Sequence, residues 1–215
     1  MLKQAAIYEI DVFVERYPAL AFLRDSLLES VAAIKAAYRS GGKILICGNG
    51  GSAADSLHVV GELMKGFALK RELPAAMAAR IMNAYPEDAQ FYLDNLQQAI
   101  PAISLVSETS LITAFSNDTS AELVFAQQVL GYGAQGDILL AISTSGDSAN
   151  VLHAAKLAKC MEMSVISLTG QGGGQLKEYS DILLEAPSVT VHQTQEFHLP
   201  IYHALCLAIE AEIFG

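Results

Sequence analysis

Residues 43–58 read KILICGNGGSAADSLH, and residues 136–151 read GDILLAISTSGDSANV. In each stretch a short apolar run is followed by small polar residues and then by a helical pattern. Continuous rather than alternating hydrophobicity is typical of strands that are covered on both faces, as in a parallel sheet. Both stretches therefore predict a strand, a tight turn and a helix.

Five such apolar runs predict strands. They cover residues 43–47, 102–106, 137–142, 164–168 and 181–185. Helical patterns lie between them at residues 53–67, 121–133 and 149–161. Alternating strands and helices predict an α/β fold with a doubly wound, five-stranded parallel sheet. Ligands are expected outside the carboxyl ends of its strands.

The length of 215 residues fits one globular domain. We expect an N-terminal helical region over residues 1–40, a sheet domain over 41–215 and a closing helix near 195–213. Residues 71–99 do not fit, because a helix-to-strand connection usually takes about two to six residues. This insertion is predicted to form one or two short helices, broken around Tyr85 and Pro86, as either a lid or an interface element.

The composition excludes several classes of protein. The chain carries 13 Lys and Arg against 23 Asp and Glu, a net charge of −10, and phosphate neutralisation needs a basic patch, so no nucleic-acid partner is expected. The acidic N-terminus and the absence of a long uncharged apolar run exclude a secretory signal and a membrane span. The odd, widely spaced cysteines lie in apolar runs and predict buried thiols in a reducing cytoplasm: Cys47, Cys160 and Cys206.

Two loops carry candidate anion-binding groups. Residues 47–52, CGNGGS, place glycines at a helix N-terminus, where backbone N–H groups can approach an anion, although a plain tight turn fits equally well. Residues 143–148, STSGDS, place four hydroxyls at another helix N-terminus. One of them can serve as an N-cap, but four exceed the need of a single cap and favour a phosphate monoester. Residues 169–174, TGQGGG, are expected to form only a flexible turn.

Two pairs of residues are candidates for chemistry. His58 and Glu62 are four residues apart on a predicted helix and share a face, as do Gln195 and His203, which are eight apart. Together they can hold a divalent metal such as zinc. Alternatively, a Glu and a His can flank a substrate as base and acid.

These motifs together resemble the sugar isomerase (SIS) superfamily, and within it the phosphoheptose isomerase branch. The matching stretches run from about residue 25 to the C-terminus, outside residues 71–99. They are CGNGGSAADSLH at 47–58, Glu62, the pair Asn117 and Asp118, GDILLAISTSGDSANV at 136–151, LTGQGGG at 168–174 and QEFHLPIYH at 195–203.

The resemblance implies a flavodoxin-like single SIS domain, a homotetramer with active sites between subunits, and a cytoplasmic enzyme of heptose biosynthesis. It implies a phosphorylated seven-carbon sugar as substrate and one zinc per subunit. The implied phosphate contacts are Ser143, Thr144, Ser145 and Ser148. The implied sugar contacts are Asn49, Gly51, Ser52, Asn117, Asp118 and Gln195. The implied metal ligands are His58, Glu62, Gln195 and His203, of which Glu62 and His203 also match the acid–base pair.

The implied reaction converts sedoheptulose 7-phosphate to D-glycero-D-manno-heptose 7-phosphate through an enediolate. It needs a base for the carbon acid and an acid for the carbonyl oxygen, which we assign to Glu62 and His203. Alternatives are a related sugar phosphate, a sugar-phosphate-sensing domain, or a non-catalytic regulator that binds a replication initiator. The regulator branch lacks residues that match Glu62 and His203, and both are present here.

Four features depart from the family pattern. Residues 192–194, His-Gln-Thr, replace a substrate-facing carboxylate and an Arg-Ile pair, which predicts altered sugar specificity. Asp147 stands where Asn is common and adds a negative charge beside the expected phosphate. Pro200 within the closing helix requires a kink or a helix start near Leu199. The insertion at 71–99 has no counterpart in the usual members.

Overall fold

A five-stranded parallel sheet forms the centre of the computed structural model, which describes all residues 1–215. Its strand order, β2-β1-β3-β4-β5, is the flavodoxin-like doubly wound order. The strands are β1 Ile44–Cys47, β2 Ala102–Ser104, β3 Ile138–Ser143, β4 Ser164–Thr169 and β5 Ile182–Glu185. Each lies within two residues of the run that predicts it, so the predicted fold class is confirmed.

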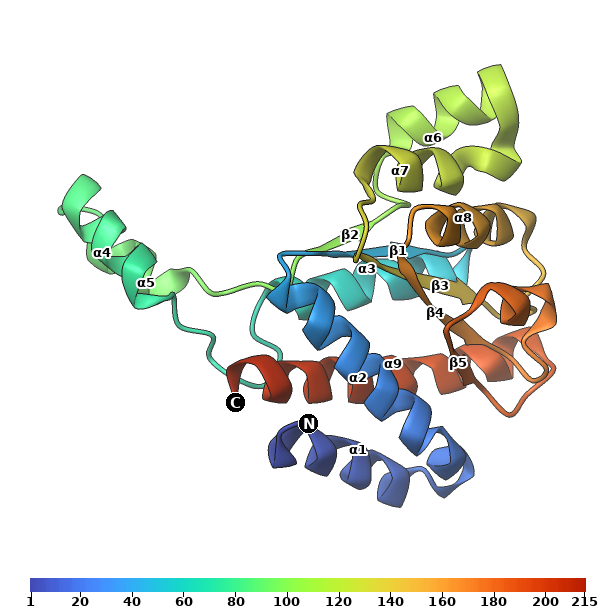
Figure 1. Ribbon diagram of the computed structural model, residues 1–215, viewed down its shortest axis with the longest axis horizontal. Helices are drawn as coiled ribbons and strands as arrows, with labels where there is room; N and C mark the ends of the chain where they lie inside the picture. The colour runs from blue at the N-terminus through green and yellow to red at the C-terminus, as the bar shows by residue number, and fades with distance from the viewer.

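Helices cover both faces of the sheet (Figure 1). One face carries α1 Gln4–Arg16, α2 Arg24–Arg39, α3 Gly51–Met64 and α9 Val191–Phe214; the other carries α7 Val124–Tyr132 and α8 Ala149–Cys160. Alternate residues of a strand serve the two cores. In β1, Ile44 and Ile46 face the first set of helices, whereas Leu45 and Cys47 face the second. Burial on both faces is the reason that the strands read as continuously apolar.

The N-terminal region belongs to the core of the domain. A 3₁₀ helix, Pro18–Leu23, joins α1 to α2, and buried residues of all three share one cluster with α9. α9 begins at Val191 and runs through Pro200, so of the two alternatives, a kink or a helix start near Leu199, the helix start is wrong. Proline lacks the N–H that would bond the carbonyl of Glu196. Glu196 is exposed, which lets water replace that partner.

α9 is long and apolar enough, by length and composition alone, to cross a membrane. However, 61 % of its apolar window is buried inside the protein. Two of its carboxylates are also buried and paired, Glu210 with Arg71 and Glu212 with Lys35. α9 is therefore a core helix of the domain.

The insertion forms an arm that projects from the body (Figure 1). It consists of α4 Ala75–Ala84 and α5 Ala89–Asn95, with the predicted break at Tyr85 and Pro86. No residue of α4 is buried. The arm is therefore an addition to the fold that contributes little to its core.

The base of the arm is closed by hydrogen bonds. The backbone N–H of Gln98 donates to the carbonyl of Arg71 at 2.8 Å, and the Gln98 side-chain amide donates to the carbonyl of Glu72 at 2.6 Å. The side chain of Arg71 is fully buried. Arg71 was expected within the insertion but belongs to the body of the domain.

Candidate active site

The sheet reverses its winding direction between β1 and β3. The chain leaves β1 toward β2 on one side of the sheet, and it leaves β3 toward β4 and β5 on the other. A crevice forms outside the carboxyl ends of strands at such a point. A cavity of about 270 Å³ lies there. Its lining residues are Asn49, Gly50, Gly51, Ser52, Ile142, Ser143, Thr144, Ser148, Val191 and Gln195.

The cavity joins the two loops that the sequence singled out. α3 and α8 both begin at its wall, and helix N-termini favour anions. Ser148 occupies the N-cap position of α8, yet its side chain makes no capping hydrogen bond. Its Oγ lies 3.0 Å from Oγ of Ser143 instead. The hydroxyl of Ser148 thus lies at the cavity wall and does not cap α8, which favours the phosphate interpretation over the cap.

Ser145 and Asp147 point elsewhere. Ser145 is exposed, does not line the cavity, and accepts a hydrogen bond from the backbone N–H of Asp147 at 3.1 Å. The carboxylate of Asp147 accepts from the backbone N–H of Gln175 at 3.0 Å. Three of the four predicted hydroxyls thus line the cavity, and the charge of Asp147 is held away from it.

Two glycines allow the surrounding backbone to approach closely. A Cβ on Gly51 would collide with the side-chain amide of Gln195, and one on Gly146 would collide with the carbonyl of Gly173. The N–H of Gly170 also donates to the carbonyl of Thr144 at 3.0 Å. The segment 169–174 is therefore packed against the serine loop and is not the flexible turn that was expected.

A second group of predicted residues lies about two helical turns further along α3 and α9. Nε2 of His58 lies 3.1 Å from Oε1 of Glu62, and Nζ of Lys65 lies 3.3 Å from Oε2 of the same carboxylate. The rings of His58 and His203 are nearly perpendicular, with centroids 5.1 Å apart. The structure thus brings His58, Glu62 and His203 together, while Gln195 lies at the cavity.

His203 has a nitrogen free for chemistry. Its Nε2 is buried and has no hydrogen-bond partner. Burial and the neighbouring His58 lower the pKa of His203 below its usual 6.5, against an opposing effect of Glu62. The imidazole is therefore mainly neutral at pH 7. A neutral imidazole can both accept and donate a proton.

Three residues that the sequence analysis did not single out lie on α3 and α9 between the two groups. The hydroxyl of Tyr202 lies 2.9 Å from Nδ1 of His58, and Oδ2 of Asp55 lies 3.9 Å from Nδ1 of His198. Burial raises the pKa of Asp55 to about 6, opposed by the nearby hydroxyl of Tyr202, and lowers that of His198 to about 4. Helical spacing could have identified Asp55 in the sequence, because it lies on the face of α3 that carries His58 and Glu62.

Asn117 and Asp118 lie outside both groups. They belong to a π-helical turn, Ser116–Ser120, that continues α6 Thr109–Phe115. Both are exposed, and the amide of Asn117 donates to the carboxylate of Asp118 at 2.7 Å. Neither lines the cavity, so one chain alone does not bring this pair to the site.

The predicted zinc ligands supply suitable donors without an assembled site. Two imidazoles and a carboxylate are donors that zinc accepts, and Nε2 of His203 is free. However, no group of three His, Cys, Asp or Glu side chains is arranged to hold a metal ion. Gln195 lies about 12 Å from His203 along the helix, at a rise of about 1.5 Å per residue. A four-ligand zinc site is therefore not assembled within one chain.

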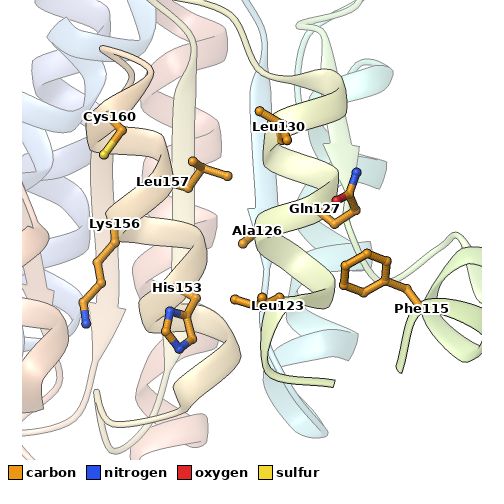
Figure 2. Close-up of a pocket in the computed structure, with 9 residues that line it drawn as sticks. All are labelled: Phe115, Leu123, Ala126, Gln127, Leu130, His153, Lys156, Leu157 and Cys160. Carbon is orange, nitrogen blue, oxygen red and sulfur yellow. The ribbon is translucent and has the colours of Figure 1, made fainter. Parts of the chain in front are cut away.

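A larger groove of about 380 Å³ lies between α7 and α8 (Figure 2). Leu123, Leu130 and Leu157 line it, with His153 and Lys156 toward one end. It contains none of the predicted site residues, and its apolar wall does not suit a phosphorylated sugar. Cys160 also lines this groove and is exposed, so the expected burial is confirmed only for Cys47 and Cys206.

Known proteins are similar to this chain in sequence. A SIS domain family model matches residues 93–170. A phosphoheptose isomerase of Akkermansia muciniphila is 34 % identical over 94 % of this chain and 93 % of its own length. One from Dechloromonas aromatica is 42 % identical over 82 % of this chain and 78 % of its own length.

Solved structures agree with the sequence comparison. A phosphoheptose isomerase from Neisseria gonorrhoeae superimposes with a TM-score of 0.73 at 33 % identity, over 91 % of this chain and 90 % of that protein. One from Francisella tularensis gives 0.71 at 34 % identity, over 86 % and 85 %. The fold, the cavity at the switch point and the histidine–glutamate cluster agree with these similarities. We conclude that the chain belongs to the phosphoheptose isomerase family.

Proposed function

We propose that the protein is an aldose–ketose isomerase that interconverts sedoheptulose 7-phosphate and D-glycero-D-manno-heptose 7-phosphate. The observation that carries this proposal is the division of the site along one helix pair. An anion cavity lies at the start of α3, and an acid–base cluster lies about 9 Å further along it, from Ser52 to His58. A heptose 7-phosphate likewise carries its phosphate and its reacting C1 and C2 at opposite ends.

The cavity suits the phosphate because its donors are neutral. The hydroxyls of Ser143, Thr144 and Ser148 and the N-termini of α3 and α8 surround it. Such groups hold a dianion by hydrogen bonds and helix dipoles without a counter-charge. The substrate then extends along α3 toward Glu62.

The acid–base cluster suits an enediolate reaction. Glu62 takes the proton from the carbon beside the carbonyl, and the electron pair of that C–H bond forms the enediolate. His203 gives a proton to the carbonyl oxygen and takes one from the neighbouring hydroxyl. Glu62 then returns its proton to the other carbon, so atoms and charge balance. General acid–base catalysis of this kind contributes about 10²- to 10⁴-fold in rate.

An isomerase assay with sedoheptulose 7-phosphate tests the proposal. Glu62→Gln keeps the shape of the side chain and is expected to lower kcat about 10²- to 10⁴-fold. Glu87→Gln, on the exposed arm, is the matched control and should leave kcat unchanged. A folded wild type without turnover on this substrate would refute it, favouring a related sugar phosphate if one is isomerised and the initiator-binding regulator if none is.

Substrate specificity is a further part of the proposal. Residues 192–194 form the first turn of α9, between Val191 and Gln195, which both line the cavity. Exchanging them for the acidic residue and Arg-Ile pair of the family should change the preference among sugar phosphates. An unchanged ranking over a panel of ketose phosphates would contradict a role in specificity.

Zinc remains a prediction, since the donor types fit but the four side chains do not converge. We propose one zinc per subunit, with His58, Glu62, Gln195 and His203 as ligands, which requires the assembly of subunits to bring together donors that one chain leaves apart. When bound, zinc would polarise the carbonyl and hydroxyl oxygens of the substrate as a Lewis acid. Metal analysis of purified protein should find about one zinc per chain, which His58→Ala abolishes; equal metal content in both would contradict the assignment.

We also propose a cytoplasmic homotetramer with active sites shared between subunits. The position of Asn117 and Asp118 outside the cavity of their own chain supports this arrangement. Light scattering should give four times the chain mass of 22.9 kDa. A monomeric enzyme with full activity would contradict it.

A further inference from the structure

The arm formed by α4 and α5 ends in exposed apolar side chains. Hydrogen bonds close its base, so the turn between the two helices is its far end. Tyr85 in this turn is 62 % exposed, Phe91 on α5 is 66 % exposed, and Met82 on α4 is also exposed. A group of large apolar side chains at the surface is typical of a site that binds another molecule. We call residues 82–91 the arm tip.

The arm tip is also acidic. Glu87 and Asp88 follow Tyr85 in the turn, and both side chains are exposed. Residues 82–91 contain no Lys or Arg. An apolar surface edged by carboxylates fits a partner surface that is apolar and edged by cations.

The groove between α7 and α8 has that complementary character. Its walls are mainly apolar, Lys156 and His153 lie toward one end (Figure 2), and none of its lining residues is acidic. The ammonium of Lys156 lies over the ring of Tyr179, 5.0 Å from its centroid. The whole chain has a net charge of −10, so most of its surface repels an acidic segment of the same chain. The groove is a place where such a segment is attracted instead.

The arm tip does not reach the groove of its own chain. Figure 1 shows the arm extending away from the body on one side, whereas α7 and α8 lie beyond the sheet on the other. The hydrogen bonds at the base of the arm hold its two ends to the body. The tip that fills the groove must therefore belong to another molecule.

We propose that the arm tip of one chain docks in the α7–α8 groove of a second copy of this chain. Two copies related by a twofold axis can exchange tips reciprocally, so that each contact is made twice. The groove contains none of the predicted site residues, so this contact is separate from the proposed function and leaves kcat unchanged.

The spacing of residues sets the orientation of the docked tip. Asp88 lies at the Lys156 end of the groove, where the opposite charges meet. Met82 and Phe91, each about one helical turn from the turn of the arm, then lie toward Cys160. Cys160 is four residues from Lys156 on α8, about 6 Å along the helix, which matches one helical turn of the arm.

Cysteine cross-linking tests this orientation. Met82→Cys and Phe91→Cys each place a thiol on the arm tip, and Cys160 is the native thiol at the groove, because Cys47 and Cys206 are buried. A short bis-maleimide should join two chains in either variant and give a band at twice the chain mass of 22.9 kDa in denaturing electrophoresis. Adding Cys160→Ser should abolish the band. Asp25→Cys, at an exposed position on α2, is the matched control and should give none.

Charge reversal tests the attraction between the tip and the groove. Lys156→Glu should lower the yield of cross-linked dimer at least about tenfold, because it places like charges together. Adding Asp88→Lys to the same chain should restore the yield. Lys159→Glu makes the same charge change on the same helix outside the groove and should leave the yield unchanged.

Three outcomes would overturn the proposal. One is a band that survives Cys160→Ser, because two arms would then contact each other. The others are no cross-link in either tip variant, each shown to be folded by circular dichroism, and equal yields in Lys156→Glu and Lys159→Glu. None of these measurements depends on turnover, so they decide the inference whatever the substrate is.

Discussion

The two ends of the contact between α3 and α9 use opposite kinds of chemistry. At the cavity end, Gly51 and Gln195 pack closely, and the polar groups are neutral hydroxyls and backbone N–H groups. At the other end, the polar groups are ionisable, and they are His58, Glu62 and His203. A binding end needs close backbone approach, which glycine allows. A reacting end needs charge in a partly buried place, and such charge must be compensated by nearby structure.

A buried ion pair lies beneath the reacting end and stabilises the contact between α3 and α9. The carboxylate of Glu210 accepts hydrogen bonds from the N–H groups of Phe67, Ala68 and Leu69 and from Nε of Arg71. The same guanidinium donates to the carbonyls of Leu63, at 2.6 Å, and of Glu62 at 3.0 Å. It thereby satisfies the C-terminal carbonyls of α3 and ties this helix to α9. No such pair exists at the cavity end.

Breaking this pair should produce the largest effect. Arg71→Met leaves the carboxylate of Glu210 buried at 1 % exposure without its counter-charge. Removing one member of a buried pair costs about 3–5 kcal/mol of unfolding free energy. Urea unfolding measures this loss. Lys70→Met, which disrupts an exposed pair with Glu72, is the control and should cost less than about 1 kcal/mol. Equal losses in the two variants would remove the contrast between the two ends.

Ser148→Ala should sharpen the comparison from the cavity end. A hydrogen bond to a charged group contributes about 1.5–3 kcal/mol, which corresponds to a rise in KM of roughly 10- to 100-fold. Because Ser148 lines the cavity at the start of α3, away from Glu62 near the other end of that helix, kcat should be preserved. Ser145→Ala is the control, since Ser145 does not line the cavity, and should change KM little. The idea fails if Ser145→Ala has the larger effect in steady-state kinetics.

Gly51→Ala should also act on the cavity end. The added methyl group collides with the amide of Gln195, and overpacking of this kind costs about 1–3 kcal/mol. We expect a higher KM and lower stability. Gly61→Ala lies on the same helix with open space around it and should instead stabilise the helix by up to about 1 kcal/mol. Thermal unfolding and KM of the two variants check the prediction, and it is contradicted if both respond alike.

The smallest effect should be a change in the pH dependence of stability, from the residues between the two ends. The folded pKa of Asp55, about 6, exceeds its unfolded value of 3.8, so its contribution to stability falls as pH rises across this window. The folded pKa of His198, about 4, is below its unfolded value of 6.5, so its contribution rises with pH over nearly the same window. The two effects oppose each other in the wild type.

Single substitutions should separate them. Asp55→Asn leaves the rising effect of His198, so stability should increase more steeply between pH 4 and 6.5 than in the wild type. His198→Gln leaves the falling effect of Asp55 and should flatten or invert the slope. Urea unfolding at several pH values measures both slopes. Three parallel curves would show that neither group changes its pKa on folding.

Much of the site was predictable because its signals are local. A run such as ILIC followed by GNGGS specifies a buried strand, a turn and a helix start within ten residues, and residues 49–52 of this stretch line the cavity. His58 and Glu62 were predictable as neighbours for the same reason, since helical periodicity alone puts them on one face. Family resemblance then supplied the association of distant segments.

The remaining features depend on how distant segments pack. In the sequence, Tyr202 has the pattern of an ordinary core residue. In the structure its hydroxyl contacts Nδ1 of His58, which is 144 residues away in the chain. Arg71 was predicted to begin an insertion, but its side chain forms a buried ion pair with Glu210. Segment 169–174 was predicted to be a flexible turn, but it packs against Gly146.

The amino-acid sequence by itself therefore determined the fold class, the strands and the two loops at the switch point. Each of these follows from hydrophobic periodicity and turn chemistry over a few residues. Only the tertiary structure decided which hydroxyls face the cavity, which charges are compensated and which side chains link the two ends. Those outcomes depend on distances between residues far apart in the chain, and no local pattern encodes them.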